Sequence, residues 1–345
     1  MSSEPLPDNT LRTRIIAVVI IAFLVVAGTA VYLAVSRAQQ QAQTDAAVAP
    51  QSLPLAQVQS GPRIVFRNTA LGTNYGVLSM VPIADPSGPR AFTSVSCDRV
   101  FATSVETLCL GSDRGVVTTY SARVITDATG AVKNIPLTGS PSRARLSDDG
   151  GLSATTSFVA GDSYTATNFS TRTVVTNLRT GMSQDLEDFT LLDSVQRISP
   201  VDRNYWGVTF TADDDHFFAT VAFGGVTHLA KGQLSTQTIE TIRTDAECPS
   251  LSPDGTRVAY KKRGDRARGD WRITVLELAT GKETQLSESR SVDDQVEWLD
   301  NGHLLYGLPG EGTQAAESNV WVVNADGTGM PTMLIPKAWS PAVVR

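Results

Sequence analysis

The chain has 345 residues, of which 41% are hydrophobic and 19% are charged, and its formal net charge is −6. These values exclude a strongly basic nucleic-acid binder and a chain that is disordered along its whole length. The apolar residues are distributed unevenly, with one long uninterrupted run near the N-terminus.

The first predicted element is a transmembrane helix over residues 15–35. This run (IIAVVIIAFLVVAGTAVYLAV) carries no charge, and as a helix it would measure roughly 30 Å, the thickness of the hydrocarbon core of a bilayer. A cleaved signal peptide has a shorter apolar core, followed by a small-x-small site. The small-x-small segment at residues 47–49 lies well downstream of the run. A buried core helix would show a polar face, which this run lacks. The sequence therefore favours an uncleaved signal anchor.

The charges around the apolar run predict its orientation. Arg12 and Arg14 precede it, whereas only Arg37 follows closely. By the positive-inside rule, residues 1–14 form a short cytoplasmic tail and everything after Val35 lies outside the cytoplasm. We therefore expect a single-pass plasma-membrane protein with its large C-terminal part on the extracytoplasmic side. Residues 36–62, rich in Gln, Ala and Pro and without aromatic residues, are predicted to form a flexible linker.

Segments of one shape recur through the rest of the chain. A hydrophobic residue leads into a polar turn, usually with Asp-Gly or Asn-Gly, and a short apolar strand follows. The segments are 146–155 (LSDDGGLSAT), 210–219 (FTADDDHFFA), 251–260 (LSPDGTRVAY) and the shorter 298–306 (WLDNGHLLY). A second signature, an alternating strand that ends in a Gly turn, recurs at 174–181, 275–281 and 322–327.

These repeats predict the architecture. A single four-stranded sheet whose strands alternate apolar and polar residues cannot bury both of its faces. Several such sheets arranged radially bury one another's faces, as in a propeller. The repeated segments that begin at residues 210, 251 and 298 are 41 (251 − 210) and 47 (298 − 251) residues apart, and each spacing is long enough for four strands. The larger spacing of 64 (210 − 146) predicts that the third blade carries an insertion, at about residues 181–204. We therefore predict an all-β, six-bladed β-propeller over residues 63–345, preceded by one transmembrane helix, with blades starting near 62, 97, 145, 210, 251 and 298.

The C-terminal segment 338–344 (AWSPAVV) has the form of a blade's opening strand with no blade after it. Its expected place is beside residues 63–66 (RIVF), where it would complete the first blade and close the ring. Such closure removes two exposed sheet edges.

The segment LSPDGTRVAY, followed by VLELATGKETQL at 275–286, resembles the WD-like propeller repeats of the TolB C-terminal domain. In that family the repeats build a six-bladed propeller that acts as a protein-interaction platform in the cell envelope. TolB itself has an additional N-terminal α/β domain and a cleaved signal, whereas this chain has an apparent anchor and a linker. The chain is thus more similar to membrane-anchored TolB-like proteins of actinobacteria, and the resemblance implies the fold and a general binding role.

Motifs for catalysis and cofactors are missing from the sequence. Propeller peptidases carry a separate hydrolase domain with a Gly-x-Ser-x-Gly motif, which does not occur here. His216 and His303 lie beside repeat turns, where exposed polar residues are expected. The sequence has no HExxH, paired CxxC, Walker A or Gly-x-Gly-x-x-Gly motif, and we expect no metal and no cofactor. The carboxylates of 213–215 fall in a repeat turn, which favours a solvated turn over a calcium site.

Two other features are candidates for local roles. Cys97 and Cys109 lie in one predicted blade and are the favoured disulfide pair, although a hairpin turning near Val105 would set Cys109 opposite residue 102, so that the bridge needs a bulge or a curled strand. Cys248 is expected to pack as a small hydrophobe.

The second feature is a basic stretch at 261–272 (KKRGDRARGDWR) on an acidic protein, which we expect to be a hairpin loop at one end of the propeller. Either it is simply a solvated loop, or it docks an anionic partner such as lipid headgroups, an anionic wall polymer or an acidic protein face. The residues of this candidate docking loop are Lys261, Lys262, Arg263, Arg266, Arg268 and Arg272.

The sequence thus predicts a membrane-anchored, extracytoplasmic propeller that binds a protein or another envelope component and performs no catalysis. The alternative is a propeller hydrolase of the glycosidase or lactonase type, with acids in the central channel. A platform predicts salt-sensitive capture of a partner without turnover. An enzyme predicts a small polar pocket in the channel that contains a pair of acids.

Overall fold

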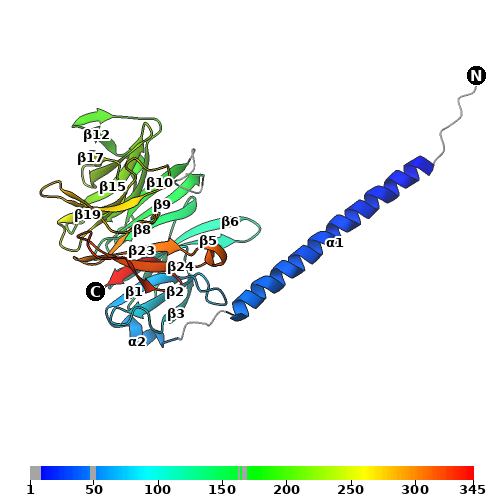
Figure 1. Ribbon diagram of the computed structural model, residues 1–345. Helices are drawn as coiled ribbons and strands as arrows, with labels where there is room; N and C mark the ends of the chain where they lie inside the picture. The colour runs from blue at the N-terminus through cyan, green and yellow to red at the C-terminus, as the bar shows by residue number, and fades with distance from the viewer. Residues whose placement is uncertain (1–8, 47–51, 162–163, 165–168) are drawn as a thin grey trace, which may run out of the picture. The chain divides into compact units, whose positions relative to one another are not determined.

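The computed structural model describes residues 9–46, 52–161, 164 and 169–345. The chain divides near residue 49 into two units, an N-terminal helix and a β-propeller (Figure 1). The propeller has six blades, each built on a sheet of at least four strands. This confirms the fold that the repeats predict.

The N-terminal unit is α1 (Asn9–Ala46). Its part from Thr13 to Tyr32 has a mean hydropathy of 2.8 and is long and apolar enough to cross a membrane. The helix continues through residues 36–46, which were expected to belong to a flexible linker. Ala and Gln, which dominate this stretch, are good helix formers, and they extend a helix that the apolar run has already nucleated.

The later part of the expected linker also differs from the prediction. A short helix, α2 (Leu55–Gln59), buries Val58 against the first blade, and the backbone N–H of Leu53 donates a 2.9 Å hydrogen bond to the carbonyl of Arg90. Composition did not reveal this contact, because three apolar side chains, Leu53, Leu55 and Val58, are enough to dock so short a segment. Residues 47–51 lie outside the described part of the chain.

The strands follow one another from the channel outward in each blade. Blade 1 has β26 (Ala338–Val344), β1 (Arg63–Asn68), β2 (Val77–Pro82) and β3 (Ala91–Ser96), and blade 2 has β4 (Arg99–Ala102), β5 (Glu106–Arg114), β6 (Thr118–Thr126) and β7 (Val132–Ile135). Blade 3 has β8 (Ser140–Leu146), β9 (Leu152–Ala160), β10 (Ser170–Asn177) and β11 (Ser183–Asp185). Blade 4 has β14 (Asn204–Phe210), β15 (His216–Phe223), β16 (Val226–Gln233) and β17 (Thr238–Thr244). Blade 5 has β18 (Glu247–Leu251), β19 (Arg257–Lys262), β20 (Arg272–Glu277) and β21 (Glu283–Gln285), and blade 6 has β22 (Glu297–Asp300), β23 (His303–Pro309), β24 (Ser318–Asn324) and β25 (Thr332–Ile335).

The predicted insertion is present, but it enlarges blade 4 and not blade 3, because its strands pair with the outer edge of the next sheet. After β11, a 3₁₀ turn (Leu186–Asp188) leads to β12 (Thr190–Asp193) and β13 (Gln196–Ile198). β12 pairs in parallel with β17, the outer strand of blade 4, and β13 pairs with β12. Blade 4 is therefore a six-stranded sheet.

The ring closes through the C-terminal strand, as expected from its sequence. β26 pairs antiparallel with β1, in register from Arg63 opposite Val344 to Asn68 opposite Ala338, and the C-terminus lies beside β1 (Figure 1). The hydrophobic core lies between neighbouring blades. One cluster, for example, joins Ile64 and Phe66 of blade 1 to Leu305 and Val320 of blade 6.

A disulfide joins Cys97 to Cys109, with a Cα–Cα distance of 5.4 Å. The hairpin register differs from the expected one, because Cys109 lies opposite Val100 and not opposite residue 102. The turn is closed by a 2.8 Å hydrogen bond from the N–H of Thr103 to the carbonyl of Glu106. Cys97 precedes β4 and curls back toward β5, so the bridge forms without a bulge within the hairpin.

We expect this disulfide to stabilise the propeller. Replacing both cysteines by serine should lower the free energy of unfolding by about 2–3 kcal/mol, because the bridge restricts the unfolded chain over a short loop. Urea unfolding of the full chain in detergent, with and without reductant, measures the effect. Reductant should weaken the wild type and leave the double variant unchanged, and equal curves for all samples would contradict the expectation.

Candidate functional site

The two ends of the propeller channel differ in the turns that surround them. Neighbouring strands of a blade run in opposite directions, so the turns after the inner strands all lie at one end and the next turns at the other. We call the first end the Asp-Gly face, which bears the turns at 147–151, 211–215 and 252–256. The second end is the loop face, which bears the β5–β6 turn (115–117) and the β19–β20 loop (263–271).

Bulges in the inner strands turn polar side chains toward the channel. The register shifts between Pro141 and Arg143 in β8, and between Glu247 and Ser250 in β18. In β14 the shift contains Gly207, with φ of +66°, and a Cβ there would lie 2.7 Å from the Cα of Cys248. Glycine is required at this position because two inner strands approach each other closely.

Charged side chains of opposite sign fill the channel. The cations come from blades 2, 3 and 5, and the carboxylates come from blade 5, from the segment that leads into blade 6 and from the start of β22. The cations are Arg99, Arg143, Arg145 and Lys261, and the carboxylates are Glu247, Asp293, Asp294 and Glu297.

The most enclosed ion pair joins Arg145 of β8 to Glu297 of β22, with 2.5 Å between Nη1 and Oε2. Both side chains are buried, and Arg145 also lies 4.4 Å from the ring centre of Phe101. Burial raises the pKa of Glu297 above its usual value, although the charge of Arg145 opposes this. The pair links blades 3 and 6 across the channel.

A second group surrounds Lys261, which is fully buried. Its Nζ lies 2.7 Å from Oδ1 of Asp293 and 4.0 Å from the ring centre of Trp271. Arg143 approaches the same carboxylate, with 3.3 Å between Nη2 and Oδ1. Partial desolvation raises the pKa of Asp293, but Lys261 and Arg143 outweigh this effect and the pKa is lowered. Asp293 is therefore a structural counter-ion.

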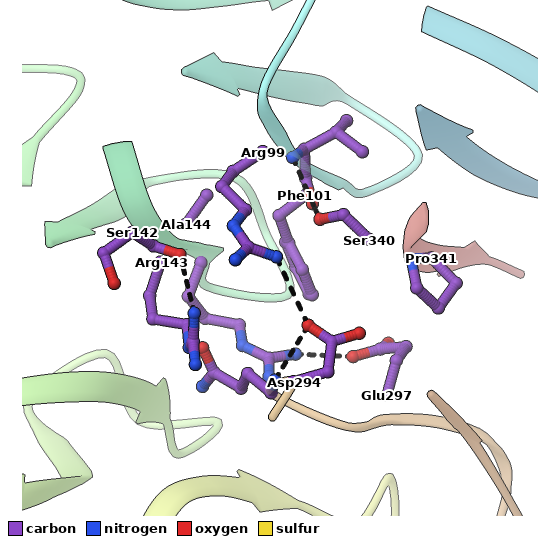
Figure 2. Close-up of a pocket in the computed structure, with 12 residues that line it drawn as sticks. Arg99, Phe101, Ser142, Arg143, Ala144, Asp294, Glu297, Ser340 and Pro341 are labelled. Carbon is purple, nitrogen blue, oxygen red and sulfur yellow. Dashed lines mark hydrogen bonds and ion pairs between the residues drawn. The ribbon is translucent and has the colours of Figure 1, made fainter. Parts of the chain in front are cut away.

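Arg99 and Asp294 form the third pair and are held less closely, with 3.5 Å between Nη1 and Oδ1 (Figure 2). Asp294 accepts hydrogen bonds from the N–H groups of Gly307 at 2.9 Å and Gln295 at 3.0 Å, which fix its carboxylate to blade 6. Burial raises the pKa of Asp294 and lowers that of Arg99.

The cavity between these groups is small. The cavity is lined by Arg99, Arg145, Asp294 and Glu297 among others. Figure 2 shows Arg99 and Asp294 pointing toward each other across it. Its volume of about 20 Å³ is close to the minimum for a single water molecule. This cavity by itself has no room for a substrate.

Both ends of the channel open into larger depressions. The mouth on the Asp-Gly face, about 400 Å³, is lined by Trp298, Phe210, Asp254 and Arg345 among others. The mouth on the loop face, about 280 Å³, is lined by nine residues: Arg67, Asp98, Arg99, Ser112, Arg114, Ser140, Pro141, Ser318 and Trp339. We call the latter the arginine mouth.

The candidate docking loop does not form one surface. Lys261 is the penultimate residue of β19 and is buried in the channel, where carboxylates match its charge; its assignment to a docking surface is wrong. Lys262 pairs with Glu283 at 2.5 Å, and Arg272 donates a 2.6 Å hydrogen bond to the carbonyl of Glu288.

The tip of the loop carries Arg263, Arg266 and Arg268. Arg266 pairs with Asp270 within the loop. Much of the loop's charge is therefore balanced locally, and docking through its tip stays a prediction.

The other residues that the sequence singled out lie away from the channel. Asp213 accepts a hydrogen bond from Thr211 and contacts His216 at 2.6 Å, while Asp215 binds Gln233 at 2.7 Å. His303 contacts Asp300 in the equivalent turn of blade 6. Asp213 and Asp300 stabilise their own turns, Asp215 connects its turn to the end of β16, and no group of three or more metal-ligand residues occurs in the described part of the chain.

No protein-family model matches the sequence, and no curated protein does. Solved structures with a similar fold exist at low identity. TolB from Acinetobacter baumannii is 16% identical, with a TM-score of 0.57 over 82% of this chain and 67% of that chain. The nidogen/laminin complex structure gives 12% identity and a TM-score of 0.55, over 82% of this chain and 98% of that one. A Mycobacterium tuberculosis puromycin-hydrolyzing peptidase gives 13% identity and a TM-score of 0.50, over 80% of this chain and 43% of that one. At these identities the likeness shows the propeller fold alone.

Proposed function

We propose that this chain is a single-pass membrane protein whose propeller serves as a binding platform on the extracytoplasmic side. The partner is an envelope protein or an anionic envelope component, and the role is like that of membrane-anchored, actinobacterial-type TolB-like proteins. α1 would supply the anchor, since it has the length and hydropathy of a membrane span.

One observation carries the binding role. The channel is filled by opposite charges around a water-sized cavity, whereas both mouths are open depressions more than tenfold larger. A platform needs an accessible surface on a rigid scaffold and no enclosed reaction chamber. The channel charges supply rigidity, because they connect blades 2, 3, 5 and 6 across the axis.

A hydrolase is the second candidate, and one observation favours it. Asp294 and Glu297 line the same cavity, and burial raises the pKa of both carboxyls, as a general acid requires. Against this role, Glu297 is engaged by Arg145 and Asp294 by two backbone N–H groups. Glu297 also lines the mouth on the Asp-Gly face, but a substrate there would have to displace Arg145 from its carboxylate.

The side of the membrane can be tested with an amine reagent that does not cross membranes. All lysines of the chain lie at or after residue 133, so lysine labelling reports on the propeller alone. Lys231 and Lys282 are exposed, whereas Lys261 is buried and serves as an internal control. We expect Lys231 and Lys282 to be labelled in intact cells. Labelling that appears only after lysis would contradict the proposed topology.

The binding role can be tested with the bifunctional form of the same reagent. Intact cells that produce the full chain are crosslinked, and species attached to the propeller are identified by mass spectrometry. A platform predicts a discrete partner whose capture decreases with added salt before crosslinking. The variants Asp294→Asn and Glu297→Gln test the alternative, because a hydrolase that uses these acids should lose turnover when either one is replaced. Absence of any adduct, together with turnover that these variants abolish, would overturn the platform in favour of a hydrolase.

A further inference from the structure

The arginine mouth has an excess of positive charge that its own residues do not match. Three of the residues that line it are arginines, Arg67, Arg99 and Arg114, against one acid, Asp98. Asp98 is already engaged, since it accepts a 2.7 Å hydrogen bond from the hydroxyl of Ser112. The depression therefore presents guanidinium groups and hydroxyls to an incoming ligand.

Arg99 lies at the floor of this mouth and is only loosely held by Asp294. Its side chain is 19% exposed, and it lines both the arginine mouth and the small internal cavity. Among the described residues, no hydrogen bond reaches its buried Nη1, and the 3.5 Å contact with Asp294 is an ion pair without hydrogen-bond geometry. Asp294 is instead hydrogen-bonded to blade 6. Nη1 is buried against Asp294, so the part of the Arg99 side chain that is available to an anion in the mouth is its exposed part.

The other two arginines are placed so that their charge faces the mouth. Arg67 is oriented by a 2.8 Å hydrogen bond from its Nε to the carbonyl of Cys97, and it packs 4.8 Å from the ring centre of Tyr75. Its terminal nitrogens have no carboxylate partner among the described residues. Arg114 is exposed at the end of β5. The indole of Trp339 lies 5.2 Å from the guanidinium of Arg99 and forms a flat apolar wall.

The mouth on the Asp-Gly face lacks this excess. Arg145 is paired with Glu297, and Nη2 of Arg345 donates a 2.5 Å hydrogen bond to the carbonyl of Trp298. Asp254 accepts hydrogen bonds from Ser252 and Thr256 in its own turn. Although this mouth is larger, its charges are mostly satisfied from within the protein.

We propose that the arginine mouth binds an oxyanion, a carboxylate or a phosphate group, through Arg67, Arg99 and Arg114. Guanidinium groups bind both kinds of oxyanion with paired hydrogen bonds, and a volume of about 280 Å³ admits a small anion or one acidic group of a larger partner. The inference deepens the proposed platform, because it assigns the partner's contact to a defined site and chemistry.

Equilibrium dialysis of the full chain in nanodiscs of neutral lipid tests this site. The probes are radiolabelled inorganic phosphate and, separately, radiolabelled succinate, at constant ionic strength. We expect one of them to bind in a ratio near one per chain, and which one binds distinguishes the phosphate from the carboxylate. Arg114→Gln and Arg99→Gln should each weaken binding about tenfold or more, as expected for loss of a charge-assisted hydrogen bond.

Arg114→Gln is the decisive variant, since Arg114 is exposed and its loss should not affect folding. Arg197→Gln is the matched control, because Arg197 is an exposed arginine on β13, a strand of the insertion in blade 4. No binding of either anion, or binding that Arg114→Gln leaves unchanged, would overturn the proposal. Neither result would remove the platform role, which the cellular crosslinking tests separately.

Discussion

Removing residues 338–345 should destabilise the propeller more than any other small change. The deletion leaves β1 without its inner partner and removes the buried side chains of Ala338, Ala342, Val343 and Val344. Burial of these groups and the lost strand pairing correspond to about 5 kcal/mol or more. We expect the melting temperature to fall by at least about 10 °C.

Thermal unfolding of the full and shortened chains in the same detergent measures this effect. A chain that lacks only Arg345 is the matched control, because Arg345 lies outside the β26 ladder. That control should melt close to the full chain. If the chain without residues 338–345 also melts at the wild-type temperature, closure of the ring by β26 contributes nothing to stability.

Breaking the ion pair between Arg145 and Glu297 should have the second largest effect. Arg145→Met leaves a carboxylate buried without its counter-ion, which costs about 3–5 kcal/mol. Replacing both residues by methionine removes the buried charge as well, so the double variant should recover most of the loss. A double-mutant cycle from urea unfolding at pH 7 gives the coupling.

The penalty of Arg145→Met should also depend on pH. Burial already raises the folded-state pKa of Glu297, and loss of Arg145 raises it further. An acid whose pKa is higher in the folded state destabilises the fold increasingly as pH rises above its unfolded value of about 4.3. The penalty should therefore be smaller near pH 4 than at pH 7. A penalty that does not change with pH, or that persists in the double variant, would contradict this account.

The sequence predicted the fold well because a propeller is built from local signals that repeat. The Asp-Gly turns at 148–150 and 254–255 mark the ends of the inner strands β8 and β18. The spacing between the repeated segments indicates the length of a blade. The lone segment 338–344 was recognisable as a strand without a blade. The expected linker is partly helical, since composition alone did not reveal the docking of Val58 or the continuation of α1.

The channel could not be predicted in the same way. Arg145 and Glu297 are 152 residues apart and meet only because the ring brings blades 3 and 6 to a common axis. A signal was nevertheless present, since Arg143 and Arg145 alternate in an inner strand and so share one face. The prediction that all basic residues of 261–272 belong to one docking loop was wrong for a related reason. The run of charges crosses the end of β19, so its first residue, Lys261, belongs to the channel and not to the loop.

Site-specific photocrosslinking in intact cells tests the central claim most directly. A photoreactive residue is placed at Val116, exposed on the loop face beside the arginine mouth, or at Ala212, exposed on the Asp-Gly face. We predict a discrete partner adduct from Val116 and not from Ala212, lost with Arg114→Gln and retained with Arg197→Gln. An adduct from Ala212 alone would leave a platform that uses the opposite face. No adduct from either position would contradict the binding platform itself.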